Sequence, residues 1–203
     1  MSKAPLHRRD LMRGQLAHDA ARLMAEGGIT DYGVAKRKAA KQMGMADTQH
    51  LPSNDEIEKA LRSFRALYQS ESHPLVLHQL RQQAFATMHV LESFHPFLTG
   101  SVLDGTAGEQ SDINLVVYSD DEKALMMFLL KYNMPFEGGE WVMQLTTGKK
   151  KTVPSFTLRT ETGVPVHIAV MPENARRSGS HKTSMYADMV AVKKILEEQA
   201  DIK

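Results

Sequence analysis

The spacing of apolar residues changes near residue 97, and this change limits the folds open to the chain more than any other feature. Before that point, apolar side chains recur at steps of three and four residues, which is the period of an amphipathic helix. Beyond it lie short β-branched runs bounded by turn residues, such as INLVVY at 113–118, which predict buried strands. We therefore expect an α+β fold. A helical N-terminal region at 1–96 would precede an α/β-type core at 97–203, built on a mixed β-sheet with flanking helices.

The helical half is expected to form four helices with recognisable ends. Ser53 and Glu56 in the stretch SNDE have the spacing of a capping box, in which each side chain bonds the backbone amide of the other. Asp31 is suited to cap the start of the helix at 32–43, and Gly27-Gly28 is suited to end the helix at 10–26. The predicted helices are 10–26, 32–43, about 54–68 and about 74–93.

Strand and helix patterns are mixed in the second half. A second capping box, SDDE at 119–122, is expected to open a helix through KALMMFLLKY. Two polar stretches, GKKK and ETG, separate three apolar runs and have the length of hairpin turns. The strands are predicted at 140–147, 152–160 and 164–171, and an amphipathic helix follows at 185–200.

Cysteine is absent from the 203 residues. This excludes disulfides, thiolate zinc sites, cysteine nucleophiles and iron–sulfur clusters, and it suits a reducing compartment. The basic N-terminus is not followed by the apolar segment of a signal peptide, and no apolar run approaches the roughly 18 residues of a membrane span. We therefore expect a cytoplasmic protein without a membrane-spanning segment.

A linked motif lies where the helical half meets the core. Leu98-Thr99-Gly100-Ser101 is followed by ten residues and then by Asp112-Ile113-Asn114-Leu115, at the start of a predicted strand. In this order and spacing, residues 97–171 resemble the nucleotidyltransferase superfamily, which includes DNA polymerase beta, poly(A) polymerases, antibiotic-modifying nucleotidyltransferases and minimal nucleotidyltransferases. The family pattern is an apolar residue, Gly-Ser or Gly-Gly, a gap, and two acids separated by one apolar residue. A third acid lies on a later strand.

The resemblance implies a phosphate site built on Gly100 and Ser101. In such a site, glycine lets the backbone approach a phosphate, while nearby amides and the serine hydroxyl bond its oxygens. Two acids spaced two apart on a strand point to one face, where they can hold magnesium. A nucleoside triphosphate would be the ligand or substrate, and Asp112 would be the metal ligand. Arg176 and Lys182, in a basic loop after the last predicted strand, would contact the triphosphate tail.

The chain departs from the family pattern at two of the three acidic positions. Asn114 stands where the second acid is expected, and His167, the inward polar residue of VPVHIAV, stands at the third. An amide oxygen carries no charge, and imidazole is a poor ligand for magnesium because hard cations prefer oxygen. We therefore expect Asp112, Asn114 and His167 to line one face with weak magnesium binding, which leaves open whether the protein is an enzyme. Asp104 or Glu109, in the intervening loop, could supply a replacement acid.

Positive charge is concentrated in the helical half. Residues 1–97 hold 13 Lys and Arg against 10 Asp and Glu, a net charge of +3, whereas residues 98–203 hold 12 against 14, a net charge of −2. Within 7–41 there are 8 basic and 4 acidic residues. The stretch AKRKAAK at 35–41 fits either a solvated helix face or a contact with nucleic acid.

Three functions are therefore open. The leading hypothesis is a nucleotidyltransferase-like protein that binds a nucleotide or phosphorylated ligand, with transferase activity weak or lost. The second is an active nucleotidyltransferase that transfers a nucleoside monophosphate with an altered metal site. The third is a nucleic-acid or protein binding module that uses the helical half. The chain has no Gly-x-Ser-x-Gly, Walker phosphate-loop or Gly-x-Gly-x-x-Gly motif, which counts against hydrolases, P-loop proteins and Rossmann proteins.

Overall fold

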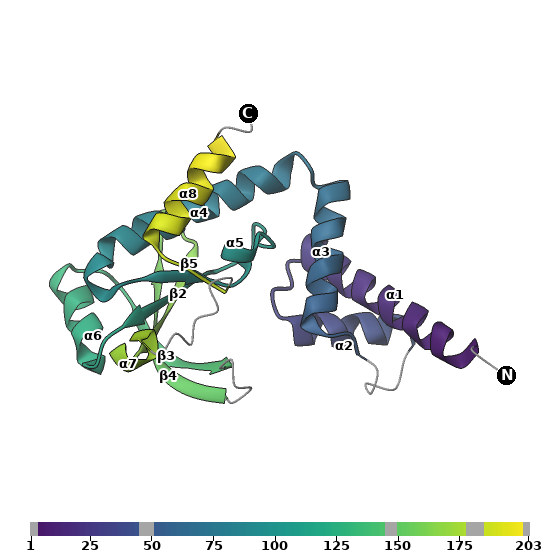
Figure 1. The fold of residues 1–203 in the computed structure, drawn as a ribbon, viewed down its shortest axis with the longest axis horizontal. Coiled ribbons are helices and arrows are strands. Elements are labelled where there is room, and N and C mark those ends of the chain that lie inside the picture. Colours follow the sequence, from purple (N-terminus) through teal and green to yellow (C-terminus); the bar gives the residue numbers. More distant parts are fainter. Residues whose placement is uncertain (1–3, 45–50, 145–149, 178–184, 201–203) are drawn as a thin grey trace. The chain divides into compact units, whose positions relative to one another are not determined.

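The structure, a computed structural model, has the α+β architecture expected from the sequence (Figure 1). It describes residues 4–44, 51–144, 150–177 and 185–200. Within these residues, helices make up the first part of the chain and a six-stranded sheet is formed by the second. No helix in these ranges is long and apolar enough to cross a membrane.

Contacts along the chain divide it into two compact units. The helical unit comprises residues 1–76 together with 108–111, and the sheet unit comprises 77–107 and 112–203. The segment 108–111 lies in the gap between Gly100-Ser101 and Asp112. Part of the predicted motif's gap therefore belongs to the helical unit. The predicted division into regions 1–96 and 97–203 stays a prediction.

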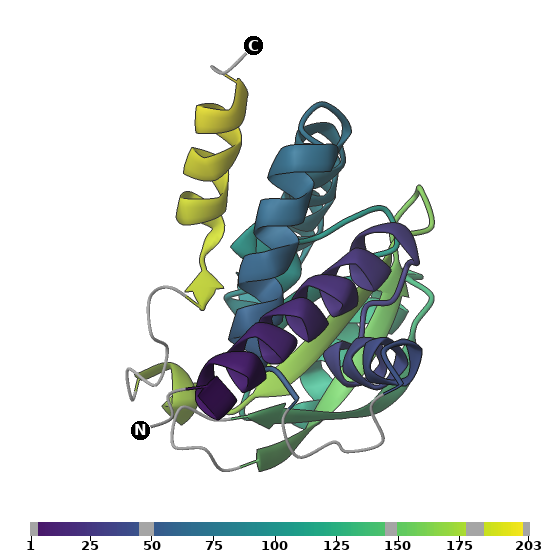
Figure 2. The same ribbon diagram turned by 90° about the vertical axis from the view of Figure 1, so that its right-hand side faces the viewer.

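The helical unit contains α1 (Ala4–Glu26), α2 (Tyr32–Gln42) and α3 (Asn54–Tyr68). Its core consists of small and aliphatic side chains from all three helices: Leu16, Ala17, Ala20, Ala21, Ala35, Ala39, Ala40, Ile57 and Leu61. Since alanines line both α1 and α2, the two helices can approach closely. Figure 2 shows α2 nearly end-on where α1 runs diagonally across the view, so the two helices cross at a steep angle.

Two of the predicted helix caps are confirmed. The amide of Glu56 donates to Ser53 Oγ at 3.1 Å, and the amide of Ser53 donates to Glu56 Oε2 at 2.6 Å, which completes the capping box of α3. Asp31 Oδ1 accepts from the amide of Val34 at 2.6 Å and caps α2. These hydrogen bonds satisfy amides that have no partner inside their own helix.

The sheet unit begins with α4 (Ser72–Val90), most of which belongs to it, and a 3-10 turn at Glu92–Phe94. Six strands follow: β1 (Phe97–Thr99), β2 (Ile113–Tyr118), β3 (Glu137–Gln144), β4 (Lys150–Arg159), β5 (Pro165–Met171) and β6 (Tyr186–Ala187). Their order across the sheet is β3-β4-β5-β2-β1-β6. The sheet is mixed, because β2 and β5 run parallel and the other neighbours run antiparallel.

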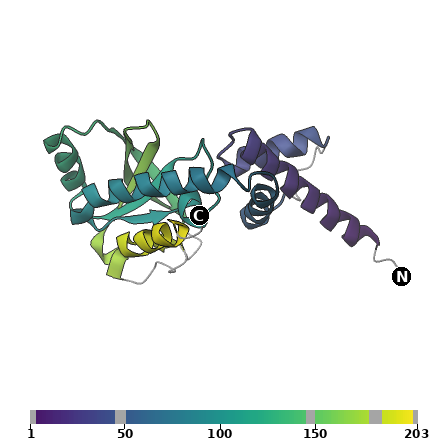
Figure 3. The same cartoon turned by 90° about the horizontal axis from the view of Figure 1, so that it is seen from above.

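Helices cover the sheet unequally. Figures 1 and 3 show α4 and α8 (Met189–Ala200) side by side over one face. The other face carries a smaller buried cluster, against which Ala175 of α7 (Glu173–Arg177) packs. The cluster consists of Val116, Tyr118, Val153, Ala169 and Met171. Alternate residues of β2 point to opposite faces, so Asn114 points to the same face as this cluster.

Two local predictions for the second half were wrong, and two short elements were missed. The helix α6 (Glu122–Lys131) is capped by Asp121, whose Oδ1 accepts from the amide of Lys123, and Ser119 bonds Asp121 rather than forming a capping box. The last helix begins at Met189 rather than at 185, because residues 186–187 pair with β1. The short elements β1 and α5 (Ser101–Asp104) were not predicted at all. Part of the predicted 140–147 strand lies outside the described residues.

Candidate functional site

The Gly100-Ser101 turn joins the end of β1 to the short helix α5. Gly100 has φ 73° and ψ −157°, a region of backbone conformation that is essentially limited to glycine. A Cβ atom on Gly100 would lie 3.1 Å from Asn114 Nδ2, so the Asn114 amide already occupies that side of the turn. The glycine is therefore required both by the backbone conformation and by the close approach of Asn114.

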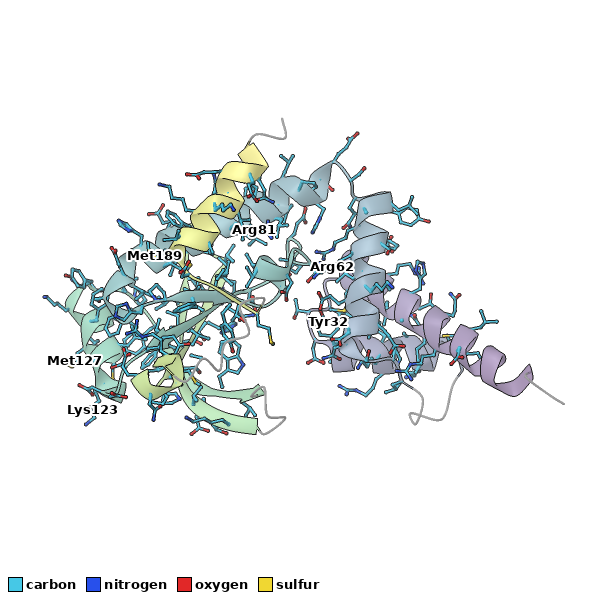
Figure 4. All side chains as sticks on the ribbon, viewed as in Figure 1. Tyr32, Arg62, Arg81, Lys123, Met127 and Met189 are labelled. Carbon is cyan, nitrogen blue, oxygen red and sulfur yellow. The ribbon has the colours of Figure 1, made fainter. Side chains whose placement is uncertain are left out.

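A buried arginine holds the other end of α5. Arg81 of α4 (labelled in Figure 4) donates from Nε to the carbonyl oxygen of Val102 at 3.0 Å and from Nη2 to that of Leu103 at 2.9 Å. Its residue exposure is only 8%. Burial lowers the pKa of the Arg81 guanidinium, and the nearby carboxylate of Asp104 opposes this shift. Arg81 thereby fixes the four-residue helix that follows the Gly-Ser turn.

Strand register places four polar side chains in one row across the sheet. Asn114 in β2 pairs with Thr99 in β1 and with His167 in β5. His167 in turn pairs with Thr157 in β4. Directly paired residues on neighbouring strands point to the same face. The row therefore lies on the face that carries the Val116 cluster, opposite to α4.

Hydrogen bonds link three members of the site. His167 Nε2 lies 3.2 Å from Asp112 Oδ2, and His167 Nδ1 lies 2.9 Å from Thr157 Oγ1. A carboxylate oxygen can only accept, so His167 Nε2 is assigned as the donor to Asp112. The side chains of His167 and Asp112 are each 37% exposed, so the pair can be reached from solvent.

This donor set does not fit a magnesium ion. Asp112 lies just before β2 and supplies a carboxylate beside the row, and its Oδ2 lies 3.2 Å from His167 Nε2. Asn114 adds a neutral amide, and magnesium prefers several hard oxygen ligands in octahedral geometry. Among the described residues, no group of three His, Cys, Asp or Glu side chains could hold a metal ion.

An aromatic side chain approaches the same histidine. The ring of Trp141, from β3, lies edge to face with the His167 ring at a centroid distance of 6.4 Å. Trp141 also packs against the Val116 cluster, in which burial raises the pKa of Tyr118. The site thus has an apolar boundary on one side and the Gly100 turn on the other. Such a combination of an apolar wall and a few polar groups is typical of small-molecule sites.

Five of the seven predicted site residues come together: Gly100, Ser101, Asp112, Asn114 and His167. Arg176 does not join them. It lies on α7, where it donates to Glu173, and its charge opposes the effect of burial, which raises the pKa of the nearby Tyr118. The Cα of Tyr118 is about 13 Å along β2 from that of Asn114. Lys182 lies outside the described residues.

The two predicted replacement acids, Asp104 and Glu109, belong to different compact units. Asp104 lies at the end of α5, where its charge acts on Arg81. Glu109 belongs to the segment 108–111, which groups with the helical unit.

Sequence reasoning missed Thr157, Thr99, Trp141 and Arg81. Thr99 and Thr157 join the site through strand pairing, and Trp141 joins it through its ring contact with His167. The pattern of a single strand does not encode such contacts. Arg81 had one detectable signal, because it falls between Leu77 and Ala84 on the apolar face of α4. A charged residue at a core position of a helix must find polar partners, and these turn out to be the α5 carbonyls.

Comparisons with known proteins give little beyond this geometry. No protein-family model matches the chain, and no curated protein matches it significantly. A solved structure described as that of a cytoplasmic RNA terminal U-transferase matches with 19% identity and a TM-score of 0.27. The match covers 70% of this chain and 35% of that one, so this chain spans about a third of its length. At this TM-score the match supports no inference about the fold or the function of this chain.

Proposed function

We propose that the protein binds a nucleotide or a phosphorylated ligand at the Gly100-Ser101 turn and has weak or no nucleotidyltransferase activity. The nucleotidyltransferase-like motif supports the ligand class. A phosphate placed beside the turn would meet the backbone, the Ser101 hydroxyl and the Asn114 amide, which lies against Gly100. Hydrogen bonds from such donors to an anion are among the stronger ones in proteins.

The Asp112–His167 hydrogen bond is the observation that supports weak or absent transferase activity. Two-metal phosphoryl transfer needs a set of carboxylates that holds the attacking and leaving oxygens between two ions. Here a histidine stands beside Asn114 at the place of the third acid, and its Nε2 engages the remaining carboxylate. Any magnesium bound at Asp112 would have to compete with this contact, so metal binding would be weak.

The alternative of an active enzyme would use Asp104 or Glu109 as a replacement acid, and it stays a second proposal; the charge of Asp104 also acts on the buried Arg81. Contact with nucleic acid through residues 7–41 is a separate proposal, which depends on the helical unit rather than on the sheet. We also propose a cytoplasmic location, for which the absence of cysteine is the support.

A thermal-shift series with the four nucleoside triphosphates, each with and without magnesium, tests the proposal. A ligand at a hundredfold excess over its Kd stabilises the folded protein by about 2.7 kcal/mol. We expect a shift that does not need magnesium and that shrinks in Ser101→Ala. The matched control is Ser63→Ala on α3, whose hydroxyl donates to the carbonyl oxygen of Lys59 at 3.1 Å.

Two outcomes would count against the proposal. If no triphosphate raises the melting temperature, the Gly100-Ser101 turn is not a phosphate site. If the shift requires magnesium and pyrophosphate is released with an acceptor present, the protein is an active nucleotidyltransferase, and the weak-activity half is wrong.

A further inference from the structure

The exposed side of α2 is a stripe of three cations and one valine. Val34, Arg37, Lys38 and Lys41 stand at positions i, i+3, i+4 and i+7, which is the spacing of one helix face, and all four are exposed. The buried side of the same helix consists of alanines: Ala35, Ala39 and Ala40. Because alanine is small, α2 can lie close to α1. Three of its four basic side chains are exposed, and the fourth, Lys36, donates to Asn54 Oδ1 at 2.7 Å.

This stripe differs from the charged faces of α3 and α8. Those two helices pair opposite charges one turn apart: Glu58 with Arg62 on α3, and Lys193 with Glu197 and Lys194 with Glu198 on α8. On α2, Arg37 and Lys38 instead lie four and three residues before another cation, Lys41, and the helix contains no acid. Like charges at these spacings destabilise a helix by about 0.2–0.5 kcal/mol per pair.

A polyanion would remove this repulsion. The acid nearest the stripe along the chain is Asp31, and its Oδ1 is already used to cap α2 at the amide of Val34. The Arg37 guanidinium lies near this carboxylate, since Asp31 Oδ1 and Arg37 Nη1 both approach the Cβ position of Gly33, at 3.1 and 3.3 Å. With three cations against this one carboxylate, the face keeps a net positive charge next to the apolar Val34, which is suited to phosphates with base edges between them.

The position of α2 in the helical unit favours double-stranded DNA among the polyanions. α1 and α2 are joined by residues 27–31, which begin with Gly27-Gly28, and the two helices cross at a steep angle (Figure 2). A second helix held across a first one by a short glycine turn is the arrangement that places a helix in the major groove. An α-helix with side chains is about 10–12 Å wide, and the groove is about 12 Å wide.

We propose that the α2 stripe docks against the major groove of duplex DNA, with Arg37, Lys38 and Lys41 contacting backbone phosphates. Val34 would face the base edges, where a thymine methyl group is a suitable apolar contact. This surface lies in the helical unit and does not involve the Gly100 turn. The DNA-docking proposal can therefore be tested independently of the proposed phosphate site.

The test uses the full chain and a fluorescent duplex of about two helical turns, roughly 20 base pairs. Binding is measured by anisotropy across a series of salt concentrations. The variant Arg37→Gln/Lys38→Gln/Lys41→Gln removes the stripe's charge and keeps good helix formers. The control variant Lys123→Gln/Lys193→Gln/Lys194→Gln removes the same charge from exposed positions of α6 and α8, and Lys123 is labelled in Figure 4.

We expect the stripe variant to bind about 100-fold more weakly at moderate salt, and its salt slope to be shallower by about 2–3 units, since each phosphate contact contributes about 0.9. The control variant should bind like the wild type. The stripe variant should also melt at the same or a higher temperature, because like-charge repulsion has been removed.

Several results would overturn the proposal. Equal losses in the two variants would mean that net charge, not the α2 stripe, governs binding. Tighter binding to a single-stranded RNA of the same length would contradict groove docking. Displacement of the duplex by polyglutamate at matched charge would indicate an acidic protein partner. Absence of duplex binding at low salt, or a lower melting temperature of the stripe variant, would contradict the charge argument itself.

Discussion

His167 Nε2 lies 3.2 Å from Asp112 Oδ2, although the two residues are 55 positions apart in the sequence. The parallel pairing of β2 and β5 makes this contact, since it sets Asn114 directly beside His167. His167 therefore stands next to the Asp112 carboxylate, and an internal hydrogen bond joins these two polar groups of the site.

Restoring the acids should restore a metal site. In Asn114→Asp/His167→Asp, three carboxylates would share one face of the sheet. Their repulsion should destabilise the protein by about 1–2 kcal/mol without metal, and millimolar magnesium should recover this loss. The measurement is the melting temperature of both proteins with and without magnesium. An equal response of wild type and variant to magnesium would show that these positions do not define a metal site.

Gly100→Ala should damage both stability and ligand binding. The new methyl group would face Asn114 Nδ2 at 3.1 Å on a backbone with φ 73°. A residue forced into this region costs about 1–3 kcal/mol of unfolding free energy, which urea denaturation measures. Gly14→Ala is the control, because it lies in α1 with nothing within 4 Å of its Cβ position and should stabilise the protein by roughly 0.5–1 kcal/mol. Similar effects of the two substitutions would show that Gly100 is an ordinary turn residue.

Arg81→Lys should loosen α5. An ammonium group lacks the planar fork with which Arg81 reaches the carbonyl oxygens of Val102 and Leu103 together. Because the site is buried, leaving one carbonyl unsatisfied should lower the free energy of unfolding by about 1–3 kcal/mol. The matched control is Arg62→Lys on α3, an exposed residue paired with Glu58, for which the change should stay within about 0.5 kcal/mol. Equal losses would contradict the role given to Arg81.

Local interactions in this protein were predictable from the sequence. The capping box of Ser53 and Glu56 and the buried strand INLVVY at 113–118 were both expected, and both are present. Each depends on residues within a few positions of one another, so the local pattern contains the information. The α+β class follows from the same patterns summed along the chain.

Non-local interactions were not predictable in the same way. β1 and β6 have three and two residues, too few for a pattern, and they are strands only because each finds a partner. The contact of Thr157 with His167 depends on the register of β4 against β5. One local prediction was wrong as well: Asp121 rather than Ser119 caps α6, since the Ser119 hydroxyl bonds the backbone of Asp121.

Gly108→Ala should disturb the segment 108–111 within the helical unit. The new Cβ would lie 2.7 Å from Arg65 Nη2, and Arg65 is held by a contact of Nη1 with His73 Nε2 at 3.0 Å. Arg65 is 5% exposed, so it has little room to move, and we expect a loss of about 1–2 kcal/mol in unfolding free energy. Gly138→Ala in β3, with nothing within 4 Å, is the control. If Gly108→Ala leaves the free energy of unfolding unchanged, the Arg65 side chain can shift to make room for the new methyl group.

The pH dependence of α3 stability should follow Glu56. Hydrogen bonding to Arg13 and to the Ser53 amide lowers the pKa of Glu56 from 4.5 to about 2. A carboxyl group with a depressed folded-state pKa contributes stability that is fully present above the unfolded-state pKa near 4.5 and is lost as pH falls towards 2. Glu56→Gln should therefore be less stable than wild type at neutral pH, and the difference should shrink as pH falls from 4.5 to 2. Since Glu56 and Arg13 are largely exposed, solvent screening keeps the effect to about 1 kcal/mol or less. Urea denaturation of both proteins across this pH range measures it, and a difference that stayed constant down to pH 2 would mean that the Glu56 charge contributes nothing to stability.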